Sequence, residues 1–543
     1  MGAEVLWWVI TCAAALVTLW PSLSDHWLWD DEGLATSGAL MNDASGLLRV
    51  WTGRGTLDYF PLTSTSFWLE RRLFDGAWGH RVDNLVLHAA NACLVGSVAL
   101  RARVPEGRAA GLLFAVHPMI VSSAAWVSER KNTLSLFFAL LALLAALPRD
   151  RAFPTRRGLG AVVGLFTLAL LAKTQVVGLP LVIAALWWLR GTPPREGWAS
   201  LGAMTVIAVG LGLLTISFQH SPPHLASVSA LERLVRAADA VRFQLVHVLW
   251  PSPLVMIHER GAVGAGLAGG LTLALIALAA GALMALGAES RERTRHWARP
   301  ALAILVSYLA LLAPTLGLLD MAFMRFAFVA EHFAYAALPV ALAAIVLALA
   351  RLPRPAFFGA LGAGVIVLGV VSHGYAASYA SREALWRHNV RVVPSAAAAH
   401  GNLALELQAE HPERAIEEAR EGVRLDPDDG ELHAFLGAVL LQQLSLDEAR
   451  TELERAIALE PGLARAHNNL ASVLVLQGEL EGGIEHLRTA LGIEPDYALG
   501  HMNLARLLAA RGELEDAHEE QARAIALDPA MREVPLVPDA PSP

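Results

Sequence analysis

The sequence predicts an all-α protein in which a bundle of transmembrane helices is followed by an α-solenoid. The first observation is composition: 55% of the residues are hydrophobic and 17% are charged, which is typical of membrane proteins. The second is a repeated motif in the C-terminal part, where residues 395–543 hold 28 acidic and 11 basic side chains. We therefore expect a transmembrane domain over residues 1–394 and a solenoid over residues 395–529.

Eleven apolar runs approach the roughly 20 residues that a helix needs to cross a bilayer. They fall near residues 5–20, 84–101, 109–127, 133–148, 158–172, 175–190, 199–217, 263–286, 300–318, 333–350 and 356–374. The run 175–190 also fits one half of a re-entrant hairpin with its neighbour. We expect a polytopic bundle of about eleven spans.

Basic loops orient these spans, because short loops on the cytoplasmic side carry the excess of Lys and Arg. Five such loops contain Arg101, Arg103 and Arg108; Arg149, Arg151, Arg156 and Arg157; Arg190 and Arg195; Arg291, Arg293, Arg295 and Arg299; and Arg351 and Arg354. Placing all five in the cytoplasm puts the N-terminus there and puts the long loop 21–83 and the solenoid outside. The Arg-, Ala- and Leu-rich composition indicates a bacterium of high genomic GC content, so we expect an inner-membrane protein with a periplasmic first loop and solenoid.

The solenoid is predicted from a motif that recurs every 34 residues, the period of the tetratricopeptide repeat (TPR) helix pair. The motif reads Leu425-Asp426-Pro427, Leu459-Glu460-Pro461, Ile493-Glu494-Pro495 and Leu527-Asp528-Pro529. In the third repeat Leu470 lines the first helix, Gly478 permits the turn, and Ile484 and Leu487 line the second helix. We expect about four repeats whose groove binds a peptide or an extended segment, and a disordered Pro-rich tail over residues 530–543.

Charge and motifs exclude several classes of function. The acidic solenoid repels phosphate groups, so we expect no nucleic-acid binding. The sequence contains no Gly-rich phosphate loop, no His-Glu-x-x-His zinc motif and no Ser nucleophile elbow. A nucleotide-fuelled or hydrolytic enzyme is therefore disfavoured, and a lipid-borne donor is the natural alternative for a transfer reaction.

Candidate chemistry begins in the first external loop, with the run Trp29-Asp30-Asp31-Glu32-Gly33. Adjacent carboxylates can bind a divalent ion such as Mg²⁺ or Mn²⁺ that holds a phosphate, or one can act as a general base toward an acceptor hydroxyl. A solvated acidic turn is the simpler interpretation of the same run. Asp30, Asp31 and Glu32 all remain candidates for the base.

Lysine usage indicates a second part of the site. The chain contains forty arginines and two lysines, Lys131 and Lys173, and both lie at predicted external ends of spans. A compact ammonium group suits a phosphate at the bilayer edge, although snorkelling at the interface is the simpler explanation. Glu129 and Arg130 precede the first lysine, and His117 lies in the same apolar run, where a buried ionisable residue is costly and often functional.

A third group, Arg325, Glu331 and His332, lies on the external side before the tenth predicted span. These residues share the predicted depth of the two lysines. The three groups together would form a site that faces outward at the membrane surface.

Several motifs follow one another in a specific order. They are Asp30-Asp31; Asp58-Tyr59-Phe60-Pro61-Leu62-Thr63; His80-Arg81-Val82-Asp83-Asn84-Leu85 with His88; Phe114-Ala115-Val116-His117-Pro118; Ala125-Trp126-Val127-Ser128-Glu129-Arg130-Lys131-Asn132; Leu171-Ala172-Lys173; Leu249-Trp250-Pro251; and Glu331-His332-Phe333-Ala334-Tyr335 with Pro339. In this order they resemble the transmembrane and TPR-containing (TMTC-like) proteins of the GT-C glycosyltransferase superfamily, which are related to protein O-mannosyltransferases. One departure is Glu331-His332-Phe333, where relatives have an Asp-Arg-Tyr-like run with a permanent cation.

The resemblance implies an inverting glycosyltransferase that moves a sugar, typically mannose, from a polyprenyl-phosphate donor to a protein hydroxyl on the external side. It implies that Asp30 and Asp31 supply the catalytic carboxylate and any contact with a divalent metal ion. The donor phosphate and its pocket would involve Arg130, Lys131 and Lys173, with Glu129 and His117 shaping the pocket. We expect no nucleotide cofactor, and we expect the TPR groove to recruit the acceptor protein.

A non-catalytic, membrane-anchored TPR scaffold that organises envelope proteins is the competing hypothesis. The acid pair discriminates between the two, because a scaffold tolerates Asp31→Asn whereas an enzyme loses transfer without losing its fold. A transporter is a third hypothesis, and it is disfavoured because the membrane half shows no obvious internal repeat.

Overall fold

A computed structural model describes residues 2–31, 34, 41, 44–54, 58–74, 76–151, 153–190, 197–218, 229–288, 292–319 and 322–536. These residues form helices and contain no β-strand, which confirms the all-α prediction. The chain divides into two compact units, with the main boundary between Ala384 and Leu385. We name them the apolar unit and the repeat unit.

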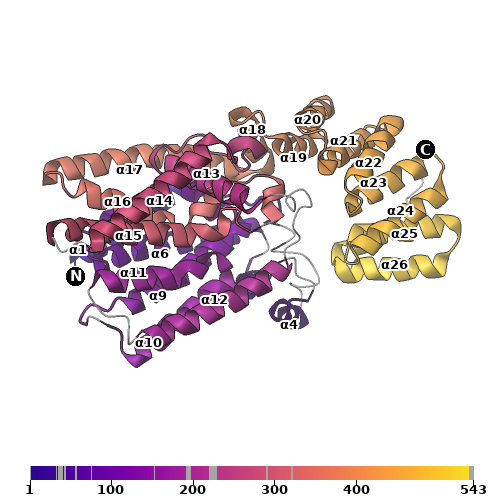
Figure 1. Cartoon of the computed structure of the whole chain (residues 1–543). Coiled ribbons are helices and arrows are strands. Elements are labelled where there is room, and N and C mark those ends of the chain that lie inside the picture. The colour runs from indigo at the N-terminus through magenta and orange to yellow at the C-terminus, as the bar shows by residue number, and fades with distance from the viewer. Residues whose placement is uncertain are drawn as a thin grey trace. The chain divides into compact units, whose positions relative to one another are not determined.

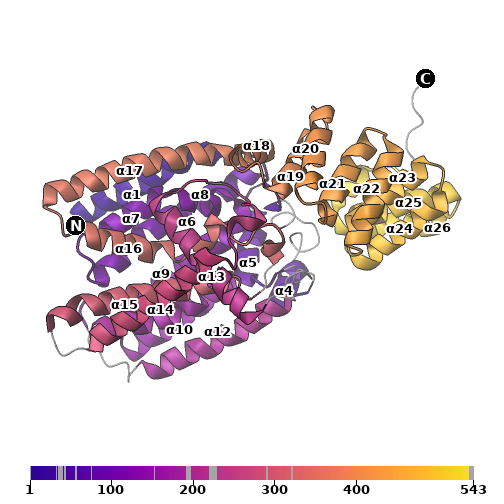
Figure 2. The same ribbon diagram turned by 45° about the horizontal axis from the view of Figure 1, so that its top comes forward.

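The apolar unit is a bundle of long helices joined by short 3₁₀ turns (Figures 1 and 2). Its helices are α1 (Gly2–Leu19), α4 (Ala44–Thr52), α5 (Pro61–Glu70), α6 (Ala77–Arg101), α7 (Arg108–Val116), α8 (Val121–Ala125), α9 (Arg130–Ala146), α10 (Arg156–Ala172), α11 (Leu179–Leu189), α12 (Trp198–Phe218), α13 (Ala230–Leu249), α14 (Leu267–Ala288), α15 (Glu292–Leu312), α16 (Leu338–Leu349) and α17 (Arg354–Ala376). The 3₁₀ helices near the site are η2 (Pro118–Ile120), η3 (Val127–Glu129), η4 (Thr174–Gly178), η8 (Ala322–Arg325) and η9 (Glu331–Ala334). Helix α6 packs against α1, α7 and α9, so it lies within the bundle.

Among the described residues, six helices are long and apolar enough to cross a membrane. They are Glu4–Ser22, Ala77–Arg101, Trp198–Phe218, Leu267–Gly287, Trp297–Thr315 and Arg354–Ala380. Helix α7 and Pro118–Ala125 form a further candidate bent by 66°, because Pro118 cannot continue the hydrogen-bond ladder of α7. Two shorter apolar helices, Thr174–Leu189 and Leu338–Leu349, match further predicted runs. Several helices could therefore span a membrane, while the number of about eleven spans stays a prediction.

The repeat unit follows α18 (Arg382–Val392) and consists of successive antiparallel helix pairs (Figure 1). The pairs are α19 (Ala397–Leu407) with α20 (Pro412–Leu425), α21 (Gly430–Gln442) with α22 (Leu446–Leu459), α23 (Ala464–Leu476) with α24 (Leu480–Ile493), and α25 (Ala498–Arg511) with α26 (Leu514–Leu527). Each second helix ends two residues before the proline of the repeated motif, since that proline cannot extend the helix. The described helices thus confirm the predicted repeats.

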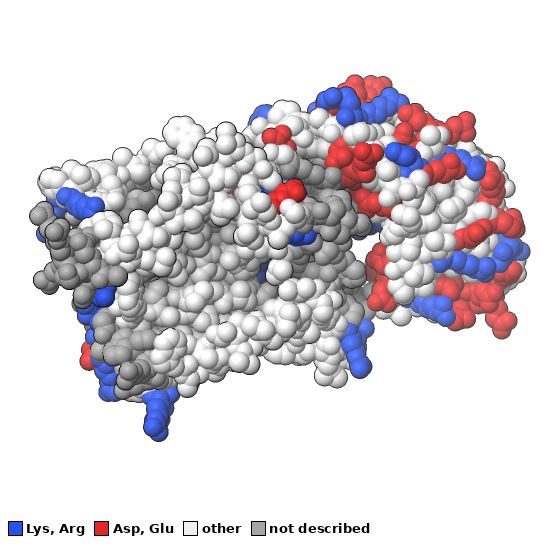
Figure 3. All heavy atoms as spheres, viewed as in Figure 1, with Lys and Arg blue, Asp and Glu red and all other residues white. Residues whose placement is uncertain are grey.

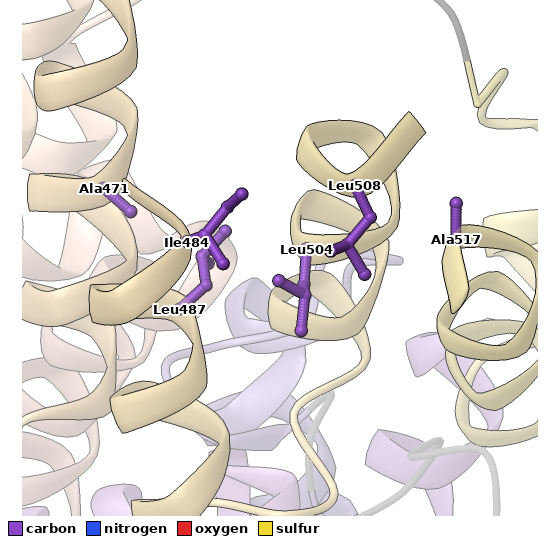
Figure 4. Packing of buried hydrophobic residues seen from close by; sticks show 6 residues of the cluster. All are labelled: Ala471, Ile484, Leu487, Leu504, Leu508 and Ala517. Atoms are coloured by element: carbon purple, nitrogen blue, oxygen red, sulfur yellow. The ribbon is translucent and has the colours of Figure 1, made fainter. Parts of the chain in front are cut away.

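Apolar side chains of neighbouring pairs form the core of the repeat unit. Figure 4 shows Ile484 and Leu487 of α24 beside Leu504 and Leu508 of α25, with Ala471 and Ala517 in the same buried cluster. Acidic side chains cover much of the outer surface of this unit, as Figure 3 shows, whereas the visible face of the apolar unit carries few charges. The charge division predicted from the sequence therefore reflects two different surfaces.

Part of the predicted disordered tail is packed against the last repeat. Residues Pro529–Glu533 form a 3₁₀ helix, and Leu536 packs against the cluster of Figure 4. Arg506 Nε also donates to the carbonyl oxygen of Pro535 at 3.1 Å. These residues cover apolar surface that the final helix pair would otherwise expose. Residues 537–543 lie outside the described part of the chain.

A histidine braces each helix pair at the same position. His433 Nδ1 lies 2.6 Å from Glu452 Oε2 on the partner helix, and its Nε2 lies 3.0 Å from the carbonyl oxygen of Pro427. The same pattern recurs at His400 and His501, while His467 faces His486 in place of a glutamate. His433, His467 and His501 each lie six residues after a motif proline, and His400 lies six residues after Pro394, so the repeat also sets this buried polar contact.

The turn inside each pair generates a prediction about stability. Gly478 and Gly512 adopt left-handed φ angles of +89° and +94° between the two helices of their pairs. Leu444 occupies the equivalent turn one repeat earlier with φ +57°, although its side chain is exposed. We expect Leu444→Gly to raise the free energy of unfolding of the repeat unit by about 1 kcal/mol, because glycine adopts this conformation without strain. Hydrogen exchange of peptides from residues 430–460 in the full chain measures the change.

The matched control is Gly478→Leu, which places leucine in the same strained turn and should lower protection by a similar amount. Equal protection in Leu444→Gly and the parent chain would show that the left-handed turn at Leu444 carries no strain.

Candidate functional site

The candidate site forms where η3, the start of α9 and the junction of α10 with η4 meet. Thr63 Oγ1 on α5 donates to the carbonyl oxygen of Ala172 at 3.0 Å, and Ser135 Oγ on α9 donates to that of Lys173 at 3.1 Å. Carbonyl groups at a helix end lack intrahelical partners, so these hydroxyls satisfy the end of α10. The backbone that carries Lys173 is thereby fixed by two other helices.

Glu129 is the charged centre of the site. Its Oε1 lies 3.3 Å from Lys131 Nζ, and its Oε2 lies 3.2 Å from Lys173 Nζ. Asn132 Nδ2 donates to the same carboxylate and, at 3.1 Å, to the carbonyl oxygen of His332. Residues two apart on one helix would not share a face. Here Glu129 ends η3 and α9 begins one residue later, so Glu129 and Lys131 reach the same pocket.

The two lysines hold Glu129 ionised. Burial alone would raise the pKa of Glu129, but the charges of Lys131 and Lys173 lower it to about 2. Burial lowers the pKa of Lys173 to about 8, and the charge of Glu129 opposes that shift. The side chains of Lys131 and Lys173 are 17% and 14% exposed, so each keeps a small contact with solvent.

Asp31 fastens the first loop to η3. It is fully buried, and its Oδ1 accepts hydrogen bonds from both the N–H and the Oγ–H of Ser128 at 2.7 Å. Its Oδ2 accepts from the N–H of Leu28 at 3.0 Å. Burial and the neighbouring charge of Asp30 raise the pKa of Asp31 to about 7. Asp31 therefore occupies a closed structural position.

Asp30 has the opposite environment, although it is the next residue in the chain. The residue is exposed, but burial of its carboxyl group raises the pKa of Asp30, and the charge of Lys131 and a hydrogen bond from Ser128 oppose that rise. Of the two described acids, Asp30 is thus the one that solvent or a substrate can reach. Glu32, the third acid of the run, lies outside the described residues.

Aromatic rings position the loop that carries the two acids. Trp29 stacks on Trp126 with ring centroids 5.6 Å apart, and Trp126 meets the edge of His332 at 5.8 Å. Trp29 has φ +34°, a left-handed backbone conformation that bulky residues rarely adopt. The packing of these rings holds the strained turn directly before Asp30.

Arg130 points into the bundle and away from the two lysines. It is 1% exposed, and its guanidinium donates to Glu70 Oε1, Asn84 Oδ1 and the carbonyl oxygen of His80. Glu70 Oε2 lies 2.6 Å from His80 Nδ1, which extends the network. Arg130, predicted to hold the donor phosphate, is therefore engaged within the bundle, since its donors already have partners.

His117 also makes internal contacts. It lies at the bend between α7 and α8, where its Nδ1 accepts from the N–H of Met119 at 3.3 Å and its Nε2 lies 3.0 Å from the carbonyl oxygen of Val248. These contacts stabilise the kink of the interrupted helix and do not join the lysine pocket. The backbone of Arg325 ends η8, but its side chain lies outside the described part of the structure.

The structure separates Glu331 from its neighbour His332. Glu331 Oε1 lies 2.8 Å from His258 Nε2, so this carboxylate pairs with a histidine and not with the lysines that contact Glu129. His332 borders the cluster, and burial lowers its pKa to about 4. The ring is therefore neutral at neutral pH and does not replace the permanent cation of the resembling family.

The contacts of Asp30 and Asp31 bear on whether the pair can bind a metal ion. The two oxygens of Asp31 already face three hydrogen-bond donors, and Lys131 brings a positive charge to Asp30. A divalent ion prefers several anionic or carbonyl oxygens without a competing cation. The geometry at Asp30 and Asp31 therefore fits a Mg²⁺ or Mn²⁺ ion poorly. The predicted metal contact gains no support from these side chains.

Several residues that shape the site were not predicted from the sequence to be functional. Ser128 and Asn132 lie inside a quoted motif, and their polarity within an apolar stretch was the available signal. Glu70 is the single acid of α5, which marks it as a partner for a buried cation. His247 and His258 belong to a different helix and loop, and their spacing carries no recognisable signal.

The tetratricopeptide repeat family matches residues 404–462, 436–498 and 469–532, which confirms the TPR array but covers a minority of the chain. A comparison with curated proteins gave no match. The family match therefore concerns the repeat unit.

Three similar solved structures each cover less than a third of this chain. The crystal structure of MamA is 21% identical and covers 28% of this chain and 90% of its own, with a TM-score of 0.24. YrrB, a TPR protein with an unusual peptide-binding site, is 22% identical and covers 30% of this chain and 82% of its own, with a TM-score of 0.23. A Thermobaculum terrenum O-GlcNAc transferase mutant is 34% identical and covers 21% of this chain and 22% of its own, with a TM-score of 0.20.

The network around Arg130 generates a prediction about stability. We expect Glu70→Gln to lower the free energy of unfolding by about 3–5 kcal/mol, because Arg130 would stay buried without its charged partner. Thermal unfolding of the full chain in detergent, followed by size-exclusion chromatography, measures the loss.

Arg71→Gln, at the neighbouring and partly exposed position, is the control and should change the free energy by less than about 0.5 kcal/mol. If both variants unfolded at the parent temperature, the pair of Glu70 and Arg130 would not be a structural ion pair.

Proposed function

We propose that this chain is an integral-membrane glycosyltransferase that moves a sugar from a polyprenyl-phosphate donor to a protein hydroxyl. The observation that carries the proposal is the exposed residue Asp30, whose carboxylate interacts with the charge of Lys131, while Lys131 and Lys173 share Glu129. A carboxylate suits an acceptor hydroxyl, and paired cations suit a leaving phosphate. The motif resemblance to TMTC-like proteins supports the same class of reaction, with mannose as the first sugar to test.

The chemistry follows from this arrangement. Asp30 accepts the proton of the acceptor hydroxyl. At the same time, the oxygen of that hydroxyl forms a bond to the anomeric carbon of the sugar. The bond between that carbon and the phosphate oxygen breaks, and its electron pair leaves with the polyprenyl phosphate. Lys131 and Lys173 stabilise the charge that develops on this oxygen, and Glu129 keeps both ammonium groups in place.

The proposal also includes location and partners. The site lies on the periplasmic side of a bacterial inner membrane, with the N-terminus in the cytoplasm. A lipid-borne donor enters from the bilayer, since the apolar unit contains several helices that could span it. The TPR array recruits the acceptor protein through its groove, as TPR domains generally bind peptides.

A non-catalytic TPR scaffold is the second candidate. The observation that favours it is the internal pairing of the charges: Asp31, Glu129 and Arg130 all have partners within the chain. In a scaffold, Asp30 and the lysines would only neutralise one another. The two candidates differ in what happens when the exposed acid alone is replaced.

We expect Asp30→Asn to lower sugar transfer by at least about 100-fold, the usual contribution of a general base. The parent and variant chains are compared in nanodiscs with polyprenyl-phosphate mannose or glucose and a lysate of host envelope proteins. Asp31→Asn is the matched variant, which should lower thermal stability, because its amide cannot accept the bonds from both Ser128 and Leu28. Equal transfer by the parent chain and Asp30→Asn, or no transfer with either donor, would favour the scaffold.

The proposed role of Asp30 as a base also predicts how the rate of transfer depends on pH. A base acts only when ionised, so transfer should be lost as the pH falls through the raised pKa of Asp30. Transfer should also decline as the pH rises through the pKa of Lys173, which burial lowers to about 8, because the neutral amine no longer stabilises the leaving phosphate. Rates measured between pH 4 and pH 9, at about one-unit steps, check this on the parent chain. A rate that increases toward acidic pH would exclude Asp30 as the base.

A further inference from the structure

A second cluster of ionisable side chains lies apart from the acid pair and the lysines. It joins His247 near the end of α13, His258 in the segment after that helix, and Glu331 at the start of η9. All three residues are buried, with 4%, 3% and 0% exposure. Their ligand atoms lie within 4.8 Å of one another, which makes the trio a candidate metal site among the described residues.

His247 is oriented as metal ligands usually are. Its Nδ1 lies 2.9 Å from the carbonyl oxygen of Phe243, one turn earlier on the same helix, and a neutral imidazole that donates there follows the usual pattern of a metal-binding histidine. Nε2 then carries a lone pair, but it lies 3.2 Å from the carbonyl oxygen of Pro253. Two electron-rich atoms at this distance repel each other unless a proton or a cation lies near them.

Glu331 also lacks part of its expected bonding. Its Oε1 meets His258 Nε2 at 2.8 Å and the N–H of Val255 at 3.4 Å. Its Oε2 is buried and has no hydrogen-bond partner among the described residues. Buried carboxylate oxygens are normally paired, so this atom has room for a further donor or a cation.

We propose that His247, His258 and Glu331 bind one divalent transition-metal ion, with zinc as the best match. Two imidazole nitrogens and one carboxylate are a ligand set that zinc accepts in tetrahedral sites, with a fourth position open to water or a carbonyl oxygen. Bonds of about 2.1 Å separate tetrahedral ligands by roughly 3.4 Å, so His258 and Glu331 would move apart slightly around the ion. The site is distinct from the metal contact expected at Asp30 and Asp31.

The ion would brace the fold beside the candidate site. It joins α13 and the loop after it to η9, and the next residue of η9 is His332, whose carbonyl accepts from Asn132. Gln244 of α13 makes a second tie to this region by donating to the carbonyl oxygen of Ala330 at 3.0 Å. The role is structural, and it does not depend on the proposed transfer reaction.

The test is the metal content of the full chain, purified in detergent with a tag that contains no histidine. We expect about one zinc ion per chain by inductively coupled plasma mass spectrometry. The zinc content should fall at least about five-fold in His258→Gln and in Glu331→Gln. His486→Gln, which alters the histidine pair of the repeat unit, and Asp30→Asn are controls that should keep the ion.

A second measurement covers variants that fail to fold. Chelator treatment of the parent chain should lower its unfolding temperature, and added zinc chloride, but not magnesium chloride, should restore it. Absence of stoichiometric metal together with no response to zinc would overturn the proposal. Metal that persists in both His258→Gln and Glu331→Gln would also overturn it, because the ion would then lie elsewhere.

Discussion

Glu129 is a carboxylate buried where the ends of several apolar helices meet, and this placement constrains the region around it. A buried charge is tolerated only with partners, because the loss of hydration is not otherwise recovered. Lys131 supplies one partner from α9, and Lys173 supplies the other from the end of α10. Asn132 joins the same carboxylate to η9. The relative positions of three chain segments therefore follow from the need to neutralise one side chain.

Neighbouring residues acquire opposite roles around this centre. Asp31 is closed into hydrogen bonds with η3, whereas Asp30 stays open to solvent, since the strained turn at Trp29 directs the two acids differently. Arg130 turns inward to Glu70, whereas Lys131 turns to the pocket, since they are successive residues at the start of a helix. In each pair, the bonded residue, Asp31 or Arg130, fixes the backbone. Its neighbour, Asp30 or Lys131, is thereby held in position at the pocket.

The sequence allowed much of the fold to be predicted, because those features depend on short-range periodicity. The apolar runs and the 34-residue recurrence are both properties of residues close together in the chain. The repeat unit is the clearest case, where Gly478 and the motif prolines place the turns and helix ends. In the site, the convergence of Lys131, Lys173 and Glu129 was expected in outline from the rarity of lysine and from the motif order.

What the sequence determined by itself is therefore the all-helical class, the apolar and repeat parts, and the short list of residues that carry unusual charge for their position. Only the tertiary structure decided their partners: that Arg130 is bound to Glu70, that Glu331 joins His258, and that Asp30 rather than Asp31 is exposed. The physical reason is the separation along the chain of the residues that interact. Helix formation and turns are decided by contacts within a few residues, whereas the neutralisation of a buried charge depends on which distant helix ends meet it.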